Sequence, residues 1–187
     1  MAKQYQDKNI FKSKKTIPLD LSDLVSYLAD DKCKYKWYGV SFQIDKPKEE
    51  VIKPQEYNNA FSDIVNTFSE INEWIIQPFH PFKLYPWVTK NDNSPEIKRL
   101  KKLFEKTLTF KGYILLSSEQ TKNLFEDLFM YSYITHSQDL IILNKEKPFI
   151  IILGQHLCLD IVSPNSNIIE EIISILKKYS YSVKRYT

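Results

Sequence analysis

The most apolar stretch of the chain runs from Asp139 to Val162, where two runs rich in isoleucine and leucine flank a short charged link. Apolar, β-branched runs separated by a short polar link predict a β-hairpin. Pro148 ends the link, and because proline cannot donate to a strand ladder, we expect it at the start of the second strand. The consecutive isoleucines 150–152 predict that both faces of this strand are covered, so it should lie centrally in a sheet.

Helical periodicity of apolar residues appears in five further segments. The expected helices run from Leu21 to Leu28, Tyr57 to Ile71, Pro95 to Leu108, Ser117 to Tyr133 and Ile169 to Leu176. Ser117 and Gln120 have the spacing of a capping box, which predicts where the fourth helix begins.

Alternation of apolar and polar residues from Lys34 to Ile44 predicts a strand with one apolar face. That face carries Tyr38, Val40, Phe42 and Ile44. Shorter strands are expected at 73–77, 112–116 and 182–187. The first of these should stop at Pro78. Together the patterns predict a single α+β domain, with about five amphipathic helices packed on a mixed or largely antiparallel sheet.

The chain of 187 residues is long enough for one domain with a sizeable core. It contains only three glycines and no glycine-rich phosphate-binding motif. Because such loops need several glycines to bring backbone close to phosphate, we expect no nucleotide cofactor.

Positive charge is concentrated in residues 1–16, which hold five lysines and one aspartate. The net charge of this segment alone is larger than the formal net charge of +3 of the whole chain, so the remaining domain, 17–187, is close to neutral. A basic terminus of this kind is usually mobile and solvated. A near-neutral body is not expected to bind nucleic acid in general, because neutralising phosphates supplies most non-specific affinity.

Cys33 and Cys158 lie far apart without ligand spacing, which favours two free thiols in a reducing compartment over a disulfide. The chain shows no signal-peptide pattern and no apolar run as long as a membrane span. A cytoplasmic location is expected, with no membrane partner.

His156, Cys158 and Asp160 alternate along one predicted strand face and form the strongest catalytic hypothesis. A nucleophilic thiol needs a base, and the base needs an orienting acceptor. Residues two apart on a strand are separated by about 6 to 7 Å, which is marginal for direct hydrogen bonds, so a mixed sheet face is the favoured interpretation. The three histidines, His80, His136 and His156, are scattered, so no metal site is predicted.

The segment 74–87 has the most unusual composition, because it interleaves five aromatic residues with three prolines. Prolines restrict the backbone, so aromatic side chains held in this way lose less entropy on docking to a partner. The predicted partner-binding residues are Phe79, His80, Phe82, Tyr85 and Trp87. The alternative is that these rings close the end of the protein's own core, which is favoured for Trp74 and Phe79.

In size, aromatic content, hairpin-centred layout and lack of a catalytic motif, the chain resembles small cytoplasmic immunity proteins of bacterial toxin–immunity systems. Its composition, rich in Lys, Asn and Ile, suggests a bacterial or phage origin. The resemblance implies an α+β domain that blocks a cognate toxin, and it covers no motif from which residue roles could be transferred. The first hypothesis is therefore a non-enzymatic binding protein that uses loops around 79–92. The others are a small enzyme built on His156, Cys158 and Asp160, and a self-associating subunit.

Overall fold

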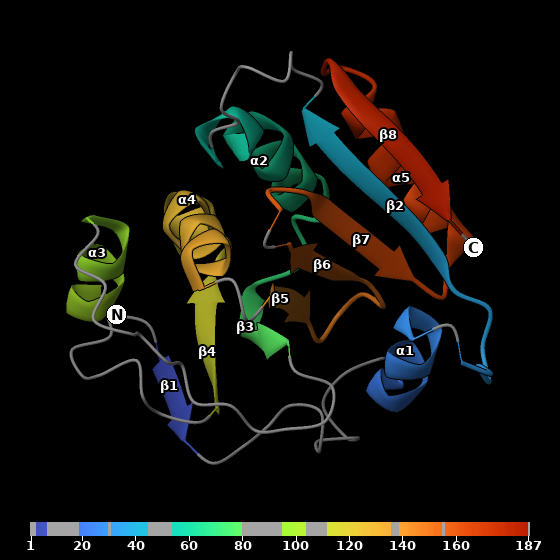
Figure 1. Ribbon diagram of the computed structural model, residues 1–187, viewed down its shortest axis with the longest axis horizontal. Helices are drawn as coiled ribbons and strands as arrows, with labels where there is room; N and C mark the ends of the chain where they lie inside the picture. Colours follow the sequence, from blue (N-terminus) through green and yellow to red (C-terminus); the bar gives the residue numbers. More distant parts are fainter. Residues whose placement is uncertain are drawn as a thin grey trace.

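A computed structural model describes most of the chain (Figure 1). The described residues are 3–6, 19–29, 31–44, 54–79, 95–103, 112–135, 139–154 and 156–186. Within them, eight strands form one sheet in the order β1-β4-β3-β5-β6-β7-β2-β8. Every neighbouring pair is antiparallel, so the predicted α+β fold is confirmed and its sheet is antiparallel throughout.

The strands are β1 (Lys3–Gln6), β2 (Tyr38–Ile44), β3 (Glu73–Phe79), β4 (Gly112–Ser117), β5 (Asp139–Asn144), β6 (Ile150–Leu153), β7 (Leu159–Ser163) and β8 (Tyr181–Tyr186). The helices are α1 (Leu21–Leu28), the short 3-10 helix η2 (Pro54–Tyr57), α2 (Asn58–Thr67), α3 (Pro95–Leu103), α4 (Ser118–Thr135) and α5 (Ser166–Leu176).

The β5–β6 hairpin lies in the middle of the sheet, as the apolar runs predict. Its turn is closed by Asn144, whose Oδ1 accepts hydrogen bonds from the backbone N–H of Glu146 at 2.9 Å and of Lys147 at 2.6 Å. Pro148 lies before the first residue of β6, where its missing N–H costs no ladder bond. The prediction of a central second strand is confirmed, because β6 pairs with both β5 and β7.

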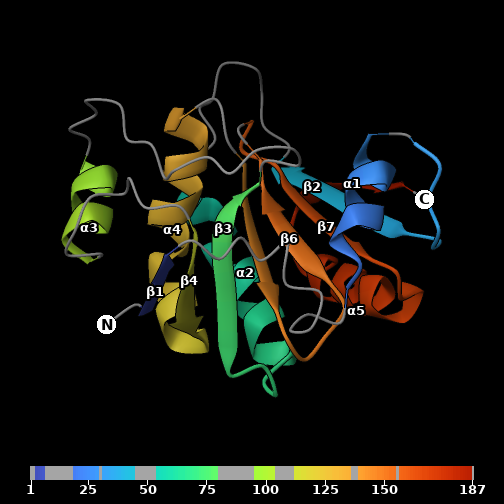
Figure 2. The same cartoon turned by 90° about the horizontal axis from the view of Figure 1, so that it is seen from below.

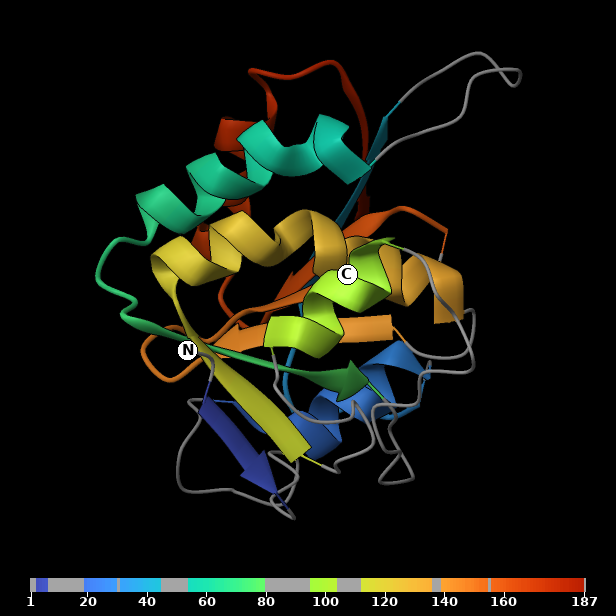
Figure 3. The same ribbon diagram turned by 90° about the vertical axis from the view of Figure 1, so that its left-hand side faces the viewer.

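Helices α2, α4 and α5 cover one face of the sheet, and α1 lies on the opposite face (Figures 2 and 3). The larger core lies on the first side, where the rings of Phe61 and Phe125 stack with centroids 4.0 Å apart. Val40 and Phe42 of β2 belong to this core, which confirms the predicted apolar face. The predicted capping box is also confirmed. Ser117 N–H donates to Gln120 Oε1 at 3.0 Å, and Gln120 N–H donates to Ser117 Oγ at 3.2 Å.

Two expectations differ from the structure at particular residues. Lys3–Gln6, for which no strand is expected from the sequence, pair with β4 as an edge strand. The outer edge of β4 offers unpaired backbone groups, and pairing there satisfies them. Strand β3 also continues through Pro78 to Phe79 instead of stopping. The pairing with β4 ends at Ile76, so beyond it β3 has a partner on one side only, which is a setting that tolerates proline.

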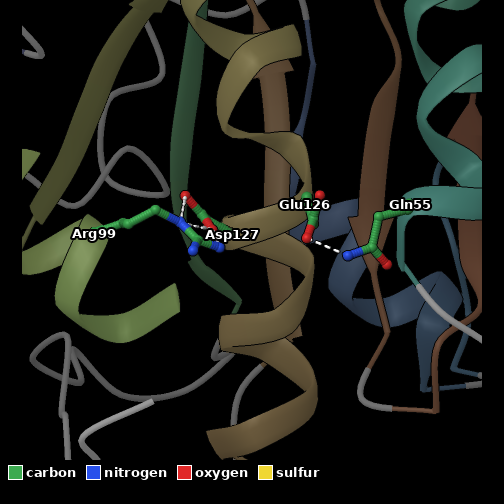
Figure 4. Close-up of polar contacts among 4 residues, drawn as sticks. All are labelled: Gln55, Arg99, Glu126 and Asp127. Atoms are coloured by element: carbon green, nitrogen blue, oxygen red, sulfur yellow. Dashed lines mark hydrogen bonds and ion pairs between the residues drawn. The ribbon is translucent and has the colours of Figure 1, made fainter. Parts of the chain in front are cut away.

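Two adjacent carboxylates fix α4 to elements on its two sides (Figure 4). Asp127 is buried and accepts a forked pair from Arg99 of α3, with Nε at 2.8 Å and Nη2 at 2.5 Å from Oδ1. Glu126 accepts from the side-chain amide of Gln55 in η2, and this contact is exposed. The forked pair is charged and its carboxylate is buried, although the Arg99 side chain is 52% exposed, so the pair should contribute modestly more than the exposed contact.

Replacing Asp127 by Asn tests how α3 is held. We expect a loss of about 1 to 2 kcal/mol in the free energy of unfolding, because the buried carboxylate that accepts from Arg99 becomes a neutral amide. Hydrogen exchange of the α3 amides should also become faster. Glu126→Gln is the matched control and should cost less than about 0.5 kcal/mol. Equal losses in denaturant titrations of the two variants would contradict this account.

Candidate protein-binding surface

The carboxylate of Asp23 in α1 organises the connection between α1 and β2. Asp23 is only 7% exposed. It accepts hydrogen bonds from the backbone N–H of Lys34, from the backbone N–H of Tyr35 at 3.0 Å and from the indole Nε1–H of Trp37 at 2.7 Å. One side chain thus satisfies three donors of residues 31–37, which we call the Asp23 loop.

The electrostatics of this site keep Asp23 ionised. Desolvation alone raises the pKa of Asp23, but hydrogen bonds from Lys34, Trp37 and Tyr35 outweigh it and bring the pKa below its ordinary value. A charged acceptor makes stronger hydrogen bonds than a neutral one, so the loop backbone is firmly held at neutral pH.

A stack of aromatic rings fixes the loop and α1 to the sheet. Trp37 is buried, and its ring lies 6.0 Å from the ring of Tyr27 in α1. Tyr27 in turn stacks on Tyr186 of β8 at 6.3 Å. Gly39 makes room for this stack, because a Cβ at that position would come within 2.2 Å of the Tyr186 ring. The support beneath the Asp23 loop therefore joins α1, β2 and β8.

The outer side of the Asp23 loop carries aromatic and cationic side chains. Tyr35 is 46% exposed, and Nζ of Lys34 lies 4.9 Å from the centroid of its ring. Lys32 and Lys36 are also exposed. Leu28, at the end of α1, is 38% exposed. We call these five residues the basic–aromatic surface.

This arrangement suits the binding of another protein that presents carboxylates. Tyrosine is favoured at protein-binding hot spots because it supplies a large contact area with few rotatable bonds. The backbone beneath Tyr35 is already fixed, so docking costs little further ordering entropy. Exposed lysines around it attract carboxylates and increase the rate of encounter with an acidic partner.

Of the partner-binding residues predicted from the sequence, Phe79 is the one that the structure describes, and it does not belong to the basic–aromatic surface. Phe79 is partly buried against the smaller core, on the α1 side of the sheet, in agreement with the core alternative for this ring. Trp74 is fully buried, and its indole N–H donates to Ser118 Oγ at 3.1 Å, so it too belongs to the core. His80, Phe82, Tyr85 and Trp87 lie outside the described residues.

Sequence reasoning missed the Asp23 loop because the segment from Lys34 alternates like a strand. The strand begins only at Tyr38. The backbone N–H groups of Lys34 and Tyr35 bond to Asp23, eleven and twelve residues earlier. The signal that could have found the surface is the repeat of lysine and aromatic residues from Lys34 to Tyr38, which is unusual on the polar side of a strand.

The residues proposed for thiol catalysis do not form a triad. His156 is exposed and lies in a turn, and Leu157 has a φ of 55°, so His156 does not share a strand face with Asp160. Cys158 Sγ lies 3.8 Å from Asp160 Oδ2. Burial, together with the charges of Asp160 and Asp139, raises the pKa of Cys158 to about 12. The thiol is therefore protonated at neutral pH, which does not favour nucleophilic chemistry.

Other chemical features give no further site. Both cysteines are free thiols, as predicted. In the part of the chain that the structure describes, no group of three His, Cys, Asp or Glu side chains could hold a metal ion. None of the described helices has the length and apolarity needed to cross a membrane. Comparisons with protein-family models, with curated proteins and with solved structures found no match for this chain.

Substituting Asn for Asp23 should lower the free energy of unfolding by about 3 kcal/mol. One carboxylate oxygen that accepts hydrogen bonds is replaced by an NH₂ group, which is itself a donor and faces the N–H groups of the loop. Asp31→Asn, on the exposed side of the same loop, is the control and should cost less than about 0.5 kcal/mol.

The effect of Asp23 should also depend on pH. Its folded pKa is lowered, so its stabilisation is present above the unfolded pKa of about 3.9 and is lost as pH falls through the folded value. The stability difference between wild type and Asp23→Asn, measured by denaturant titration, should therefore narrow below about pH 4. A difference that stays constant down to pH 2 would show that the carboxylate charge does not matter.

Alkylation of Cys158 with iodoacetamide should be slow. A pKa of about 12 leaves roughly one thiolate in 10⁴ at pH 8. Site-resolved mass spectrometry should therefore show at least a roughly 100-fold slower reaction in the native protein than in the same chain unfolded in urea. A native rate equal to or above the unfolded rate would reinstate the thiol-enzyme hypothesis.

Proposed function

We propose that this chain is a non-enzymatic protein-binding module, an immunity protein that binds and neutralises a cognate bacterial toxin in the cytoplasm. The observation that carries the proposal is the Asp23 loop, which holds Tyr35 and its flanking lysines outward on a fixed backbone. A surface that is ordered before binding and rich in one charge is typical of selective protein recognition.

The chemistry of the surface indicates what the toxin should present. Lys32, Lys34 and Lys36 are exposed on the loop, so the complementary patch of the toxin is acidic. The near-neutral domain that carries the loop gives no broad positive field for nucleic acid. Two free thiols fit a reducing compartment, which supports the cytoplasm as the place of action.

The alternative function is a small enzyme whose site is assembled from His156, Cys158 and Asp160. The protonated state of Cys158 gives this alternative little support. The neighbouring Asp160 does not change this, because its negative charge lies beside the Cys158 thiol and disfavours the thiolate.

Co-expression of the chain with the toxin encoded beside its gene tests the proposal. Wild-type chain should restore bacterial growth, and the purified proteins should form a complex. Tyr35→Ala should weaken that complex by roughly 30-fold, because removing a central aromatic anchor typically costs about 2 kcal/mol. Isothermal titration calorimetry measures the affinity.

Tyr133→Ala is the matched control, because Tyr133 is exposed to a similar degree, 37%, but lies on α4 and not on the basic–aromatic surface. It should leave both growth and affinity unchanged. Failure of the wild-type chain to protect cells would refute the proposed function. Protection that is equally sensitive to both tyrosines would refute the assigned surface.

A further inference from the structure

Strand β8 forms one edge of the sheet. Among the strands that the structure describes, it pairs with β2 alone, and the strand order ends at β8. Figure 1 shows β8 at the rim of the molecule, with no described element beyond it. The four residues 182–185 are all exposed. An open edge presents a row of backbone N–H and C=O groups that can pair with another strand.

The side chains of β8 point alternately to the two faces of the sheet, and their contacts identify each face. Tyr186 stacks on Tyr27 of α1, so Lys184, two residues earlier, projects on the α1 side. Arg185 pairs with Glu170 of α5 at 2.5 and 2.9 Å, so Val183 projects on the α5 side. The open edge thus has an exposed cation on one side. On the other side, Val183 is 39% exposed.

The edge is continuous with the basic–aromatic surface. Tyr186 at the end of β8 is paired with Gly39, which lies two residues beyond the Asp23 loop. Lys184 and Trp37 of the loop lie on the same side of the sheet, since Trp37 belongs to the core under α1. Nζ of Lys36 lies instead over the ring of Tyr38, which packs against the larger core. A strand laid along β8 on the α1 side therefore passes from Lys184 toward the Asp23 loop.

We propose that an extended segment of the partner protein, with alternating acidic and apolar residues, adds to the open edge of β8. Its carboxylates lie on the α1 side near Lys184, and its apolar side chains lie beside Val183. Backbone hydrogen bonds supply affinity, and the alternation supplies specificity. The inference rests on the proposed function and deepens it. A second copy of β8 would fit less well, because it would bring a second Lys184 to the side of the edge that already carries one.

The probe is a blocked octapeptide in which Glu and Val alternate, titrated into the full-length ¹⁵N-labelled chain. We expect the amide signals of β8 to shift, and alternate β8 amides to become protected from hydrogen exchange. Lys184→Glu should weaken peptide binding about fivefold, because an opposite-charge pair becomes a like-charge pair. A peptide in which Lys replaces Glu should bind at least as weakly to the wild-type chain.

A pair of proline variants separates binding from folding. Successive N–H groups in a strand point to opposite edges, so of Val183→Pro and Lys184→Pro one removes a hydrogen bond to β2 and the other removes a donor at the open edge. The variant with the nearly unchanged melting temperature should lose at least tenfold in peptide affinity. If that variant binds the Glu–Val peptide normally, strand addition is refuted.

Other outcomes also decide the matter. Peptide binding without shifts in β8, equal binding of the Lys–Val peptide, or no binding would each overturn the proposal. Sedimentation of the chain alone should show a monomer. A dimer that dissociates in the open-edge proline variant would assign the edge to a second copy. Each of these failures leaves toxin neutralisation and its dependence on Tyr35 intact, so the two proposals fail separately.

Discussion

The hydrogen-bonded carboxylate of Asp23 is the interaction on which the whole exposed surface of the α1 side depends. Buried backbone N–H groups must find acceptors, and a loop has no ladder to supply them. Asp23 provides that acceptor for Lys34 and Tyr35, and it also takes the indole N–H of Trp37. Without it, the segment would have to extend as a strand or open to water. With it, the chain turns sharply and presents Tyr35 outward.

The two faces of the sheet serve different purposes. Three helices cover one face and enclose the larger core, which includes the stacked pair Phe61 and Phe125. On the other face, α1 is fixed by the stack of Trp37, Tyr27 and Tyr186. This stack holds the Asp23 loop against a sheet whose central strands are buried on both sides. A rigid scaffold with a short ordered loop at its rim is a common arrangement for recognition.

Local patterns in the sequence predict the elements, because their causes lie within a few residues. The capping box of Ser117 and the position of Pro148 follow directly from backbone chemistry. The Asp23 loop could not be predicted in this way. The carboxylate that accepts its hydrogen bonds lies eleven residues before Lys34, on a helix whose sequence is that of an ordinary amphipathic helix. The expected place of His156 on a strand face differs from the structure for a similar reason. Apolar and polar residues alternate without interruption from His156 to Asp160, but the positive φ of Leu157 interrupts the extended backbone there.

The charge distribution explains how the loop and the strand edge could act together. Arg185 is occupied by Glu170, so its cation is largely neutralised on the α5 side. Lys184 remains exposed on the α1 side, and the lysines of the adjoining Asp23 loop are also exposed. The acidic partner that we propose would therefore be attracted to the region where the loop meets β8. In that proposal charge selects the partner and its orientation, and main-chain hydrogen bonds, which are insensitive to sequence, supply affinity without losing selectivity.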